Sequence, residues 1–248
     1  NTSEPNLITL TDSYKVTHWK QYPHGTRRIY SFFESRGGDF PNVLFFGLQY
    51  IMKKYLCGQA ITAAKIERAK RRLDRHFSNT TYMNVQGWEY ILKAHDGRLP
   101  LHIKAVAEGS LVPTKNVLYT VENTDPEVPW LTNYIEPLLS QVWYPSSVGI
   151  VSYSMRQRVL QALIETGDPA LIDYKVHDFG LRGSTSVESA MIGGAAHLIN
   201  FRGTDTLPAL DLLEDYYHEP DAGHSIAAAE HSSITSWGRA HEADAYRS

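Results

Sequence analysis

The stretch "YKVHDFGLRGSTSVESAMIGGAAHLINFRGTDTLPALDLLEDYY", residues 174–217, decides the fold predicted for this chain. Strand-like runs alternate with helical patterns through this stretch and beyond it, in the order 174–180, 186–198, 198–201, 208–217, 225–230 and 232–246. The strand-like runs start roughly 25 residues apart, which leaves room for one helix between each pair. Because parallel strands need such crossover connections, the alternation predicts a parallel sheet or an α/β barrel.

Short signals predict where the first of these helices begins and how it packs. Thr185 and Glu188 form a T-x-x-E pattern, which predicts a capping box. Gly193 and Gly194 fall inside the helical pattern, where they indicate close packing and not a phosphate-binding loop. The chain contains no G-x-x-x-x-G-K-[ST], G-x-G-x-x-G, G-x-S-x-G or H-E-x-x-H motif, and its histidines show no zinc spacing.

The first part of the chain lacks this alternation and predicts a mixed α/β domain. Helices are expected at 13–22, 43–56, 61–77, 130–143 and 147–166, and strands at 27–35, 101–106 and 116–123. The basic face of the run 61–77 is expected to be a solvated surface. Pro145 disfavours helix at Tyr144, so the predicted domains are 1–144 and 145–248.

Composition limits the possible partners and compartment. The formal net charge is −3, which does not suggest a nucleic acid or a membrane surface as partner. The single cysteine, Cys57, excludes an internal disulfide framework and fits a reducing compartment. No apolar run approaches the ~18 residues of a membrane-spanning helix. We therefore expect a cytoplasmic protein.

Polar and aromatic side chains follow each strand-like run of the alternating region. They are Asp178, Phe179 and Arg182 after the first run, Arg202 and Asp205 after the second, and Glu230 and His231 after the third. The carboxyl ends of parallel strands meet at one edge, so a shared site is favoured. Taken singly, Asp205 could instead be a helix N-cap and His231 a core histidine. Arginines and a histidine near helix N-termini suit phosphates, and Phe179 beside Asp205 suits a flat heteroaromatic ring with a hydrogen-bond donor.

Several stretches resemble the nicotinamide phosphoribosyltransferase family: "TDSYKVTHWKQYP", "FFGLQYIMKKYL", "VLYTVENTDPE", "WLTNYIEPLL", "HDFGLRG", "INFRGTDT" and "AAEHSSITSWG". The resemblance implies synthesis of nicotinamide mononucleotide and pyrophosphate from nicotinamide and phosphoribosyl pyrophosphate, with Mg²⁺ and with stimulation by ATP. It also implies a type II phosphoribosyltransferase fold, with a smaller mixed α+β domain followed by an irregular α/β barrel. Members of the family work as head-to-tail homodimers with shared active sites.

The resemblance also implies roles for residues that bind the substrates. Phe179 resembles one wall of a ring stack, and Tyr14 resembles the other wall, contributed by the partner subunit. Asp205 would accept a hydrogen bond from the carboxamide NH₂ group. Arg182 would contact the base or the pyrophosphate, and Arg36 would help to bind phosphate.

Two further residues resemble the part of the family site that couples ATP to synthesis. His231 resembles the histidine that ATP phosphorylates. Glu230 would hold the imidazole of His231, as carboxylates beside reactive histidines do. We therefore assign both residues to catalysis on the basis of the resemblance, and we assign no metal-binding residue.

The sequence departs from the family in length and at individual positions. Family members are longer, and only the first β-α units of the barrel are present, so we expect an incomplete barrel and a chain that is inactive alone. Leu181 and His224 stand where the family leads us to expect tyrosine. Two alternatives remain open: a nicotinate phosphoribosyltransferase, which Asp205 argues against because a carboxylate repels an acid, and a shortened, non-catalytic form that dimerises with a full-length partner.

Overall fold

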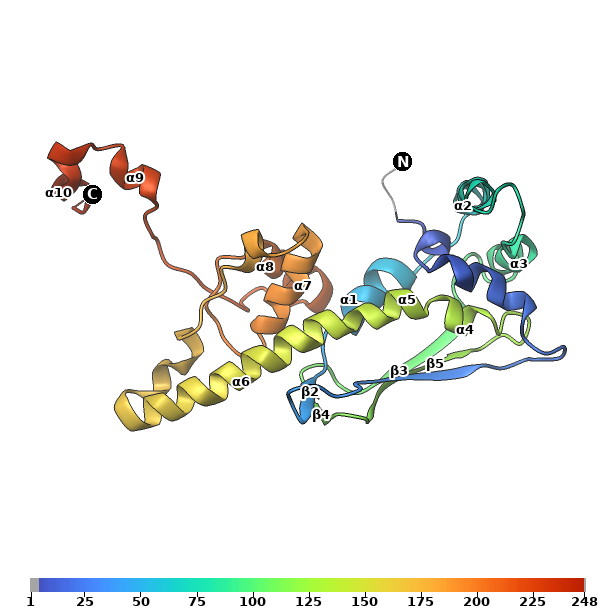
Figure 1. Ribbon diagram of the computed structural model, residues 1–248, viewed down its shortest axis with the longest axis horizontal. Coiled ribbons are helices and arrows are strands. Elements are labelled where there is room, and N and C mark those ends of the chain that lie inside the picture. The colour runs from blue at the N-terminus through green and yellow to red at the C-terminus, as the bar shows by residue number, and fades with distance from the viewer. Residues whose placement is uncertain (1–4, 248) are drawn as a thin grey trace.

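A computed structural model describes residues 5–247 as a mixed helical and stranded body arranged along one long helix, α6 (Trp143–Thr166). Figure 1 shows a sheet and the helices α2 and α3 at one end of α6. Helix α7 packs on the middle of α6, and α8 packs on α7. The other α-helices are α1 (Leu48–Ile51), α2 (Ala63–His76), α3 (Val85–Ala94), α4 (Leu131–Tyr134), α5 (Glu136–Leu139), α7 (Val187–His197), α8 (Leu207–Tyr217), α9 (His231–Thr235) and α10 (Glu242–Ala245).

The strands form two small antiparallel sheets. They are β1 (Tyr30–Glu34), β2 (Asn42–Leu44), β3 (Leu101–Ala105), β4 (Leu111–Pro113) and β5 (Val117–Asn123). One sheet has the order β1-β5-β3, with Phe32 opposite Thr120, and the other pairs β2 with β4. The predicted strands at 27–35, 101–106 and 116–123 are confirmed as β1, β3 and β5. Ile103 of β3 and Tyr119 and Val121 of β5 pack into the core, as alternate residues of half-buried strands do. In β1 only Phe33 packs against the core, whereas the rings of Tyr30 and Phe32 are exposed.

The core of the first part of the chain is built on aromatic rings. Trp88 of α3 is fully buried, and the edges of its neighbours Trp130 and Tyr134 lie with ring centroids 4.8 and 5.0 Å away. Edge-to-face contacts of this kind add to the stabilisation from burial. The prediction of an amphipathic helix at 61–77 is confirmed as α2, whose Ile66, Ala69 and Leu73 are buried.

The predicted helix 43–56 is wrong in its first half. Its first residues form β2, and the helix begins only after Gly47. Gly47 has φ +101, and a Cβ there would lie 2.6 Å from Cγ of Pro145. A left-handed residue pressed against a neighbour cannot continue a right-handed helix, so α1 starts at Leu48 and passes into a π-helix, Met52–Leu56.

Helix α6 runs through the position of the predicted domain boundary. Pro145 lies in its first turn, where the missing N–H would have no helical partner in any case. The expected interruption of the helix at 144–147 is therefore wrong, whereas the division into domains stays a prediction. The expected helix 130–143 is instead α4, α5 and a 3-10 turn, Ser140–Val142. Helix α6 contacts β2 from the first part of the chain and α7 from the second part, so it packs against both predicted domains.

The second half keeps the first two predicted helices but not the predicted strands. Helices α7 and α8 are confirmed, whereas the runs 174–180, 198–201 and 225–230 form no strand. Residues 198–200 continue the turn at the end of α7, because N–H groups of Asn200 and Phe201 bond to the carbonyl of His197. What remains of the parallel pairing is two bridges, Asp178 to Thr204 and Gly203 to His224.

The capping of α7 also differs from the prediction. Ser186 is the N-cap, and its hydroxyl accepts from the N–H of Ser189 while the Ser189 hydroxyl accepts from the N–H of Ser186. This reciprocal pair replaces the predicted box of Thr185 and Glu188. Glu188 is consequently available to bind side chains of the first half.

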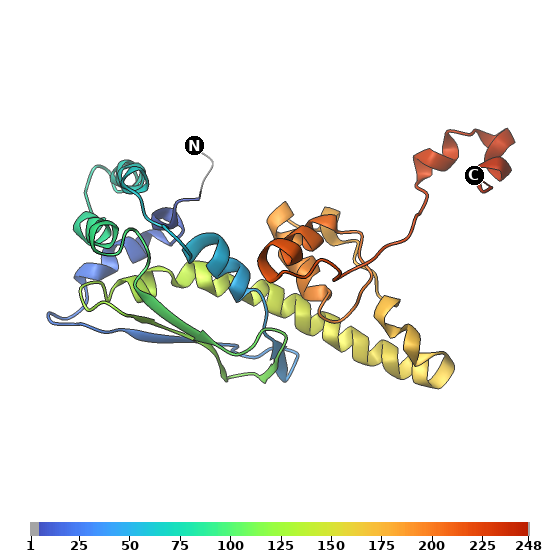
Figure 2. The same ribbon diagram turned by 180° about the vertical axis from the view of Figure 1, so that it is seen from behind.

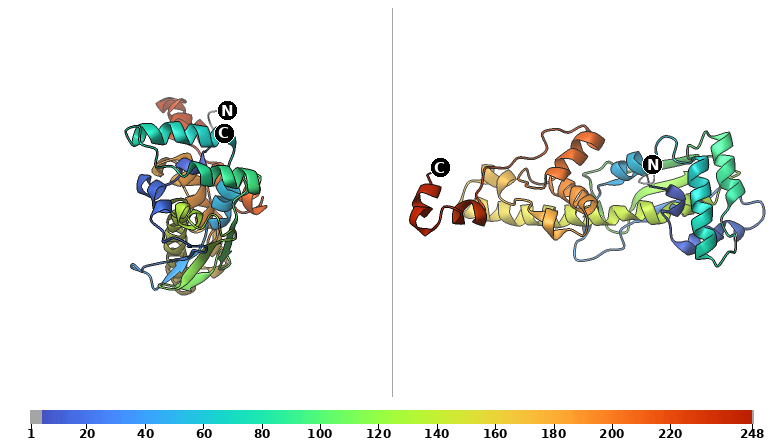
Figure 3. Two further views of the ribbon diagram at one scale, coloured as in Figure 1. Left: turned by 90° about the vertical axis from the view of Figure 1, so that its right-hand side faces the viewer. Right: turned by 90° about the horizontal axis from the view of Figure 1, so that it is seen from above.

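The last segment of the described chain extends away from the body. Figures 1 and 2 show α9 and α10 joined to the body by an extended stretch, and Figure 3 shows them at the opposite end of the molecule from α2 and α3. The predicted helix 232–246 is wrong because Gly238, at φ +70, interrupts it and a 3-10 turn, Arg239–His241, precedes α10. The predicted helix 13–22 is a 3-10 helix, Ser13–Lys20. In the described residues, no helix has the length and apolar character needed to cross a membrane.

Candidate functional site

The two parallel bridges bring three distant segments to one edge. The N–H of Asp178 donates to the carbonyl of Gly203 at 3.0 Å, and the N–H of Thr204 donates to the carbonyl of His224 at 3.0 Å. The residues that follow each bridge therefore lie side by side, as expected for the carboxyl ends of parallel strands. Loops converge on this edge from α7 and α8.

Asp205 receives two side-chain hydrogen bonds at this edge. The hydroxyl of Ser225 donates to its Oδ1 at 2.5 Å, and Nε2 of His177 lies 2.7 Å from the same oxygen. The bonds from Ser225 and then from His177 hold the pKa of Asp205 below its usual range. Asp205 is therefore an exposed, ionised acceptor whose position is fixed on two sides.

Phe179 presents an open aromatic face next to this carboxylate. Its side chain is 69% exposed, and its ring centroid is 4.6 Å from the ring of His177. His177 thus contacts both Phe179 and Asp205. An exposed ring beside a fixed carboxylate suits a flat ligand that carries an N–H donor.

Arg182 lies in the 3-10 turn Gly180–Gly183, directly after Phe179. Asp178 shapes this turn, because its Oδ1 accepts from the N–H of Gly180 at 2.7 Å. The side chain of Arg182 is exposed and can reach an anion near the edge. The ring of Phe179 and the cation of Arg182 therefore lie in one short segment, and the carboxylate of Asp205 lies in the segment bridged to it.

A buried histidine supports the segment that carries Phe179. The hydroxyl of Ser152 lies 2.9 Å from Nδ1 of His197, and the carbonyl of Val176 lies 3.1 Å from Nε2. Burial lowers the pKa of His197, so the ring is neutral, with Nε2 donating to the carbonyl and Nδ1 accepting from the hydroxyl. This arrangement ties the chain at Val176 to α6 and α7.

The packing glycine predicted inside α7 is confirmed. A Cβ on Gly194 would lie 2.8 Å from Cβ of Ala209 and 3.0 Å from Oδ2 of Asp178. Only glycine allows α7, α8 and the bridged segment to approach this closely. Gly194 therefore helps to set the position of the candidate site.

Glu230 and His231 lie apart from this edge, on the extended last segment. Both are exposed, and Glu230 is the N-cap of the short helix α9. The Glu230 carboxylate accepts from the hydroxyl of Ser232, and in residues 5–247 no hydrogen bond joins it to the His231 ring. The expected contact between Glu230 and His231 is thus absent from this structure, and the pair does not meet Asp205.

Tyr14 and Arg36 lie in the first half of the molecule. Tyr14 is 58% exposed on the 3-10 helix Ser13–Lys20, with its ring centroid 5.1 Å from that of His18. Arg36 follows β1 and borders a cavity of about 810 Å³ between the β1-β5-β3 sheet and the start of α6. The structure does not bring either residue to the edge that carries Asp205 within one chain.

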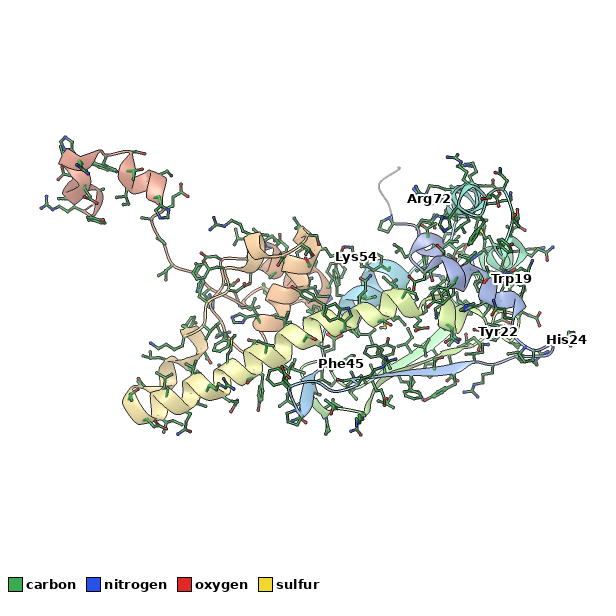
Figure 4. All side chains as sticks on the ribbon, viewed as in Figure 1. Trp19, Tyr22, His24, Phe45, Lys54 and Arg72 are labelled. Atoms are coloured by element: carbon green, nitrogen blue, oxygen red, sulfur yellow. The ribbon has the colours of Figure 1, made fainter. Side chains whose placement is uncertain are left out.

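A second polar cluster joins the two halves near the start of α7. Oε1 of Glu188 accepts from the hydroxyls of Tyr50 at 2.8 Å and Tyr55 at 2.6 Å, and from Nζ of Lys54 at 2.9 Å. Figure 4 shows Lys54 beside the helices of the second half. Burial opposes the ionisation of Glu188, but the bonds from Tyr55, Lys54 and Tyr50 outweigh it and lower the pKa.

Two residues of the site were missed by the sequence analysis, His177 and Ser225. A signal for His177 exists, because residues two apart in an extended segment share a face, and His177 is two before Phe179. Ser225 directly follows the bridge residue His224, so it stands at the carboxyl end of the third segment. If the three segments had been placed side by side in the order given by the bridges, His177 and Ser225 would both have been expected next to Asp205.

Comparison with known families matches two parts of the chain. Residues 6–103 match the family described as nicotinamide phosphoribosyltransferase, N-terminal domain. Residues 174–248 match the nicotinate phosphoribosyltransferase family. The second match contains the bridged edge with Phe179, Arg182 and Asp205.

Curated relatives match nearly the whole chain. A nicotinamide phosphoribosyltransferase of Xanthomonas campestris is 50% identical over 98% of this chain and 51% of its own length. One of Acinetobacter baylyi is 34% identical over 98% of this chain and 51% of its own length. The chain thus spans about half the length of these curated relatives.

A solved structure supports the fold. The crystal structure of human nicotinic acid phosphoribosyltransferase aligns with a TM-score of 0.58 and 20% identity, covering 92% of this chain and 40% of that one. At this identity the similarity concerns the fold alone, and it agrees with the predicted α/β phosphoribosyltransferase fold. This chain corresponds to only part of the longer human chain. The chain therefore carries an N-terminal domain of the nicotinamide phosphoribosyltransferase family and a segment that matches the nicotinate phosphoribosyltransferase family, and it is similar along nearly its whole length to curated nicotinamide phosphoribosyltransferases.

Proposed function

We propose that this chain contributes the base-binding half of an enzyme that makes nicotinamide mononucleotide and pyrophosphate from nicotinamide and phosphoribosyl pyrophosphate, in the recovery of NAD. The observation that carries the proposal is the contact of His177 with both Asp205, at 2.7 Å, and Phe179, at a ring distance of 4.6 Å. The names of the curated relatives support the same activity.

In this proposal each residue of the edge has one task. Nicotinamide stacks on Phe179, and its carboxamide NH₂ donates to Asp205. Its ring nitrogen already has a lone pair, so attack on the anomeric carbon needs no base. The reaction requires positioning and stabilisation of the leaving pyrophosphate, which Arg182 would provide. Arg36 would help to bind phosphate.

Mg²⁺ would neutralise charge on the phosphates when it is bound. In the described chain no group of three or more histidine, cysteine or acidic residues could hold a metal ion. We propose that Mg²⁺ enters with the substrate phosphates, as Mg²⁺ commonly does.

ATP would act through His231. The exposed imidazole on α9 is accessible to a phosphoryl donor, and a neutral histidine nitrogen can accept a phosphoryl group. Glu230 would orient this ring once α9 lies against the rest of the site. This contact requires the Glu230 carboxylate to release the hydroxyl of Ser232, from which it accepts here.

We further propose a homodimer in which Tyr14 supplies the second wall of the ring stack to the partner's site. The support is that Tyr14 is exposed and lies in a different part of the chain from Phe179, so that one chain does not form the stack in this structure. A cytoplasmic location is part of the proposal and is supported by the single, exposed Cys57.

A nicotinate phosphoribosyltransferase is the second candidate, and the family match over residues 174–248 favours it. The ionised Asp205 argues against it, because its charge would repel the nicotinate carboxylate. The non-catalytic, shortened form remains a third candidate, which activity of the chain with and without the remaining half would distinguish.

The test replaces Asp205 by Asn in a protein that carries this chain together with the remaining half of its relatives' length. A charge-assisted hydrogen bond contributes roughly 1.5–3 kcal/mol, so the ratio of kcat/KM for nicotinamide over nicotinate should fall about tenfold or more. Asp211→Asn is the control, since Asp211 is an exposed carboxylate on α8 away from the edge. An unchanged ratio in Asp205→Asn would show that Asp205 does not select the amide.

A further inference from the structure

A basic groove lies far from the candidate site, between the first two 3-10 helices and α2. It has a volume of about 530 Å³, and its walls are formed by Ile8, Thr9, Thr11, Ser13, Val16, Arg68, Arg71, Arg72, Leu73, Arg75 and His76. Ile8, Val16 and Leu73 are buried and form the apolar floor. Figure 4 shows Arg72 on α2, at the opposite end of the molecule from α9. The sequence predicted a solvated basic face here, whereas the structure makes that face one wall of a concavity.

The positive charge of this groove is not neutralised by nearby carboxylates. In residues 5–247, no ion pair involves Arg71, Arg72 or Arg75, and all three are exposed. Asp74, the acid on the same turn, is engaged by Lys70 at 2.8 Å and by the hydroxyl of Thr81 at 3.0 Å. Glu67 of α2 and Asp12 do not line the groove. Three guanidinium groups within five residues are thus available to a ligand.

The hydroxyl groups and the histidine that line the groove already have hydrogen-bond partners within the protein. The hydroxyl of Thr9 donates to the carbonyl of Asn6 at 3.0 Å, and that of Thr11 donates to the carbonyl of Tyr134 at 2.9 Å. The ring of His76 is held by a contact of 2.7 Å between its Nε2 and the hydroxyl of Ser13. The wall opposite α2 therefore has fixed hydroxyl groups, and among the described residues the guanidinium groups of Arg71, Arg72 and Arg75 are the donors that face a ligand.

We propose that this groove binds a small oligophosphate, a molecule with two or more linked phosphate groups. Guanidinium groups present paired donors that match phosphate oxygens, and three of them on one helix can contact adjacent phosphates. A volume of about 530 Å³ fits a small molecule, which favours it over an extended acidic peptide. Within one chain, none of the residues that line the groove belongs to the edge that carries Asp205 and Arg182.

Calorimetric titration of the chain with sodium tripolyphosphate tests the proposal. The groove variant Arg71→Gln/Arg75→Gln should weaken binding at least about tenfold, which corresponds to about 1.4 kcal/mol. The matched control Lys93→Gln/Arg158→Gln removes the same charge from exposed positions outside the groove and should change binding by less than about twofold, because screened surface charges act weakly at distance. Circular dichroism verifies that each variant keeps its helices.

A third variant, Arg182→Gln, separates the groove from the proposed catalytic site. It should leave tripolyphosphate binding within about twofold of the unchanged chain if the groove is the site. Unchanged binding by the groove variant would overturn the proposal. So would an equal loss in the control pair, which would indicate non-specific attraction, or a loss confined to Arg182→Gln, which would place the ligand at the catalytic edge.

Discussion

The two halves of the molecule differ in how their extended segments are held. In the first half, β5 pairs on both sides, with β1 and with β3, and aromatic rings cover the sheet. In the second half the extended segments meet at two bridges, and residues 224–233 are all exposed. Ile226, with 83% of its surface exposed, has a strand-forming side chain but no core to enter.

This difference indicates that a partner strand and burial of one face turn a strand-like run into a strand. The residues proposed to do chemistry lie mainly in the loosely packed half, while the first half supplies the rigid part. The Glu188 cluster joins the two. Substitutions can test whether stability and function separate along this line.

The largest expected effect is the loss of ATP coupling in His231→Ala. In a protein with the remaining half present, ATP hydrolysis and its stimulation of synthesis should disappear, while some ATP-independent transfer remains. Label from γ-phosphate should appear on the unchanged protein as an acid-labile, base-stable adduct and be absent from the variant. His241→Ala, an exposed histidine on the same segment, serves as control. Retained label and stimulation in His231→Ala would contradict the role of His231.

The next effect is a loss in the free energy of unfolding when a tryptophan is removed, which should be large in the first half of the molecule and small in the last segment. Trp88→Ala removes a fully buried ring that contacts Trp130 and Tyr134, and should lower the free energy of unfolding by about 3–5 kcal/mol. Trp237→Ala, in the last segment, should lower it by less than about 0.5 kcal/mol, because that ring is 43% exposed. Urea titration followed by circular dichroism compares them, and similar losses would remove the contrast between the halves.

The sequence correctly predicted those elements in which the spacing of apolar residues alone shows which face is buried. Helix α2 shows this clearly, because Ile66, Ala69 and Leu73 recur at helical spacing and are buried. The run 43–56 could not be predicted, since the break at Gly47 depends on contact with Pro145, about a hundred residues away. The predicted strand at 225–230 did not form, because a strand needs a partner strand beside it. The neighbouring segment that bridges to His224 cannot extend far enough to be that partner, since α8 begins only two residues after Asp205.

The candidate site was predicted in part. Asp205 and Phe179 were expected near each other, and the bridge from Asp178 to Thr204 accounts for it. His177 and Ser225 were missed because a motif shows which residues are present but not which side chains meet. The contact of Glu230 with His231 was expected from the resemblance to the family, yet neighbours along a chain point to different sides of a helix start.

A smaller effect is expected where the halves join. Glu188→Gln keeps the shape but removes the charge that accepts from Tyr50, Lys54 and Tyr55, and should lower the free energy of unfolding by about 1–3 kcal/mol. Glu165→Gln, on the exposed end of α6, should change it by less than about 0.5 kcal/mol. Hydrogen exchange at the first turn of α7 should increase only in Glu188→Gln, and equal protection in both variants would show that the cluster does not join the halves.

The smallest effect concerns the ionisation of Asp205. Ser225→Ala removes the stronger of the two bonds that lower the pKa of this carboxyl group, so the pKa should rise toward its ordinary value. A carboxyl group with a lowered pKa in the folded state stabilises the fold above its unfolded pKa, and this contribution is lost as the pH falls through the folded pKa. Ser225→Ala should therefore reduce stability in mildly acidic and neutral solution and leave Asp205 ionised at neutral pH. Carboxyl ¹³C resonances measured against pH would report the shift, with Asp211 as internal reference. If the Asp205 resonance titrated at the same pH in the variant, the bond from Ser225 would not be what lowers the pKa, and the loosely packed half would hold its carboxylate through His177 alone.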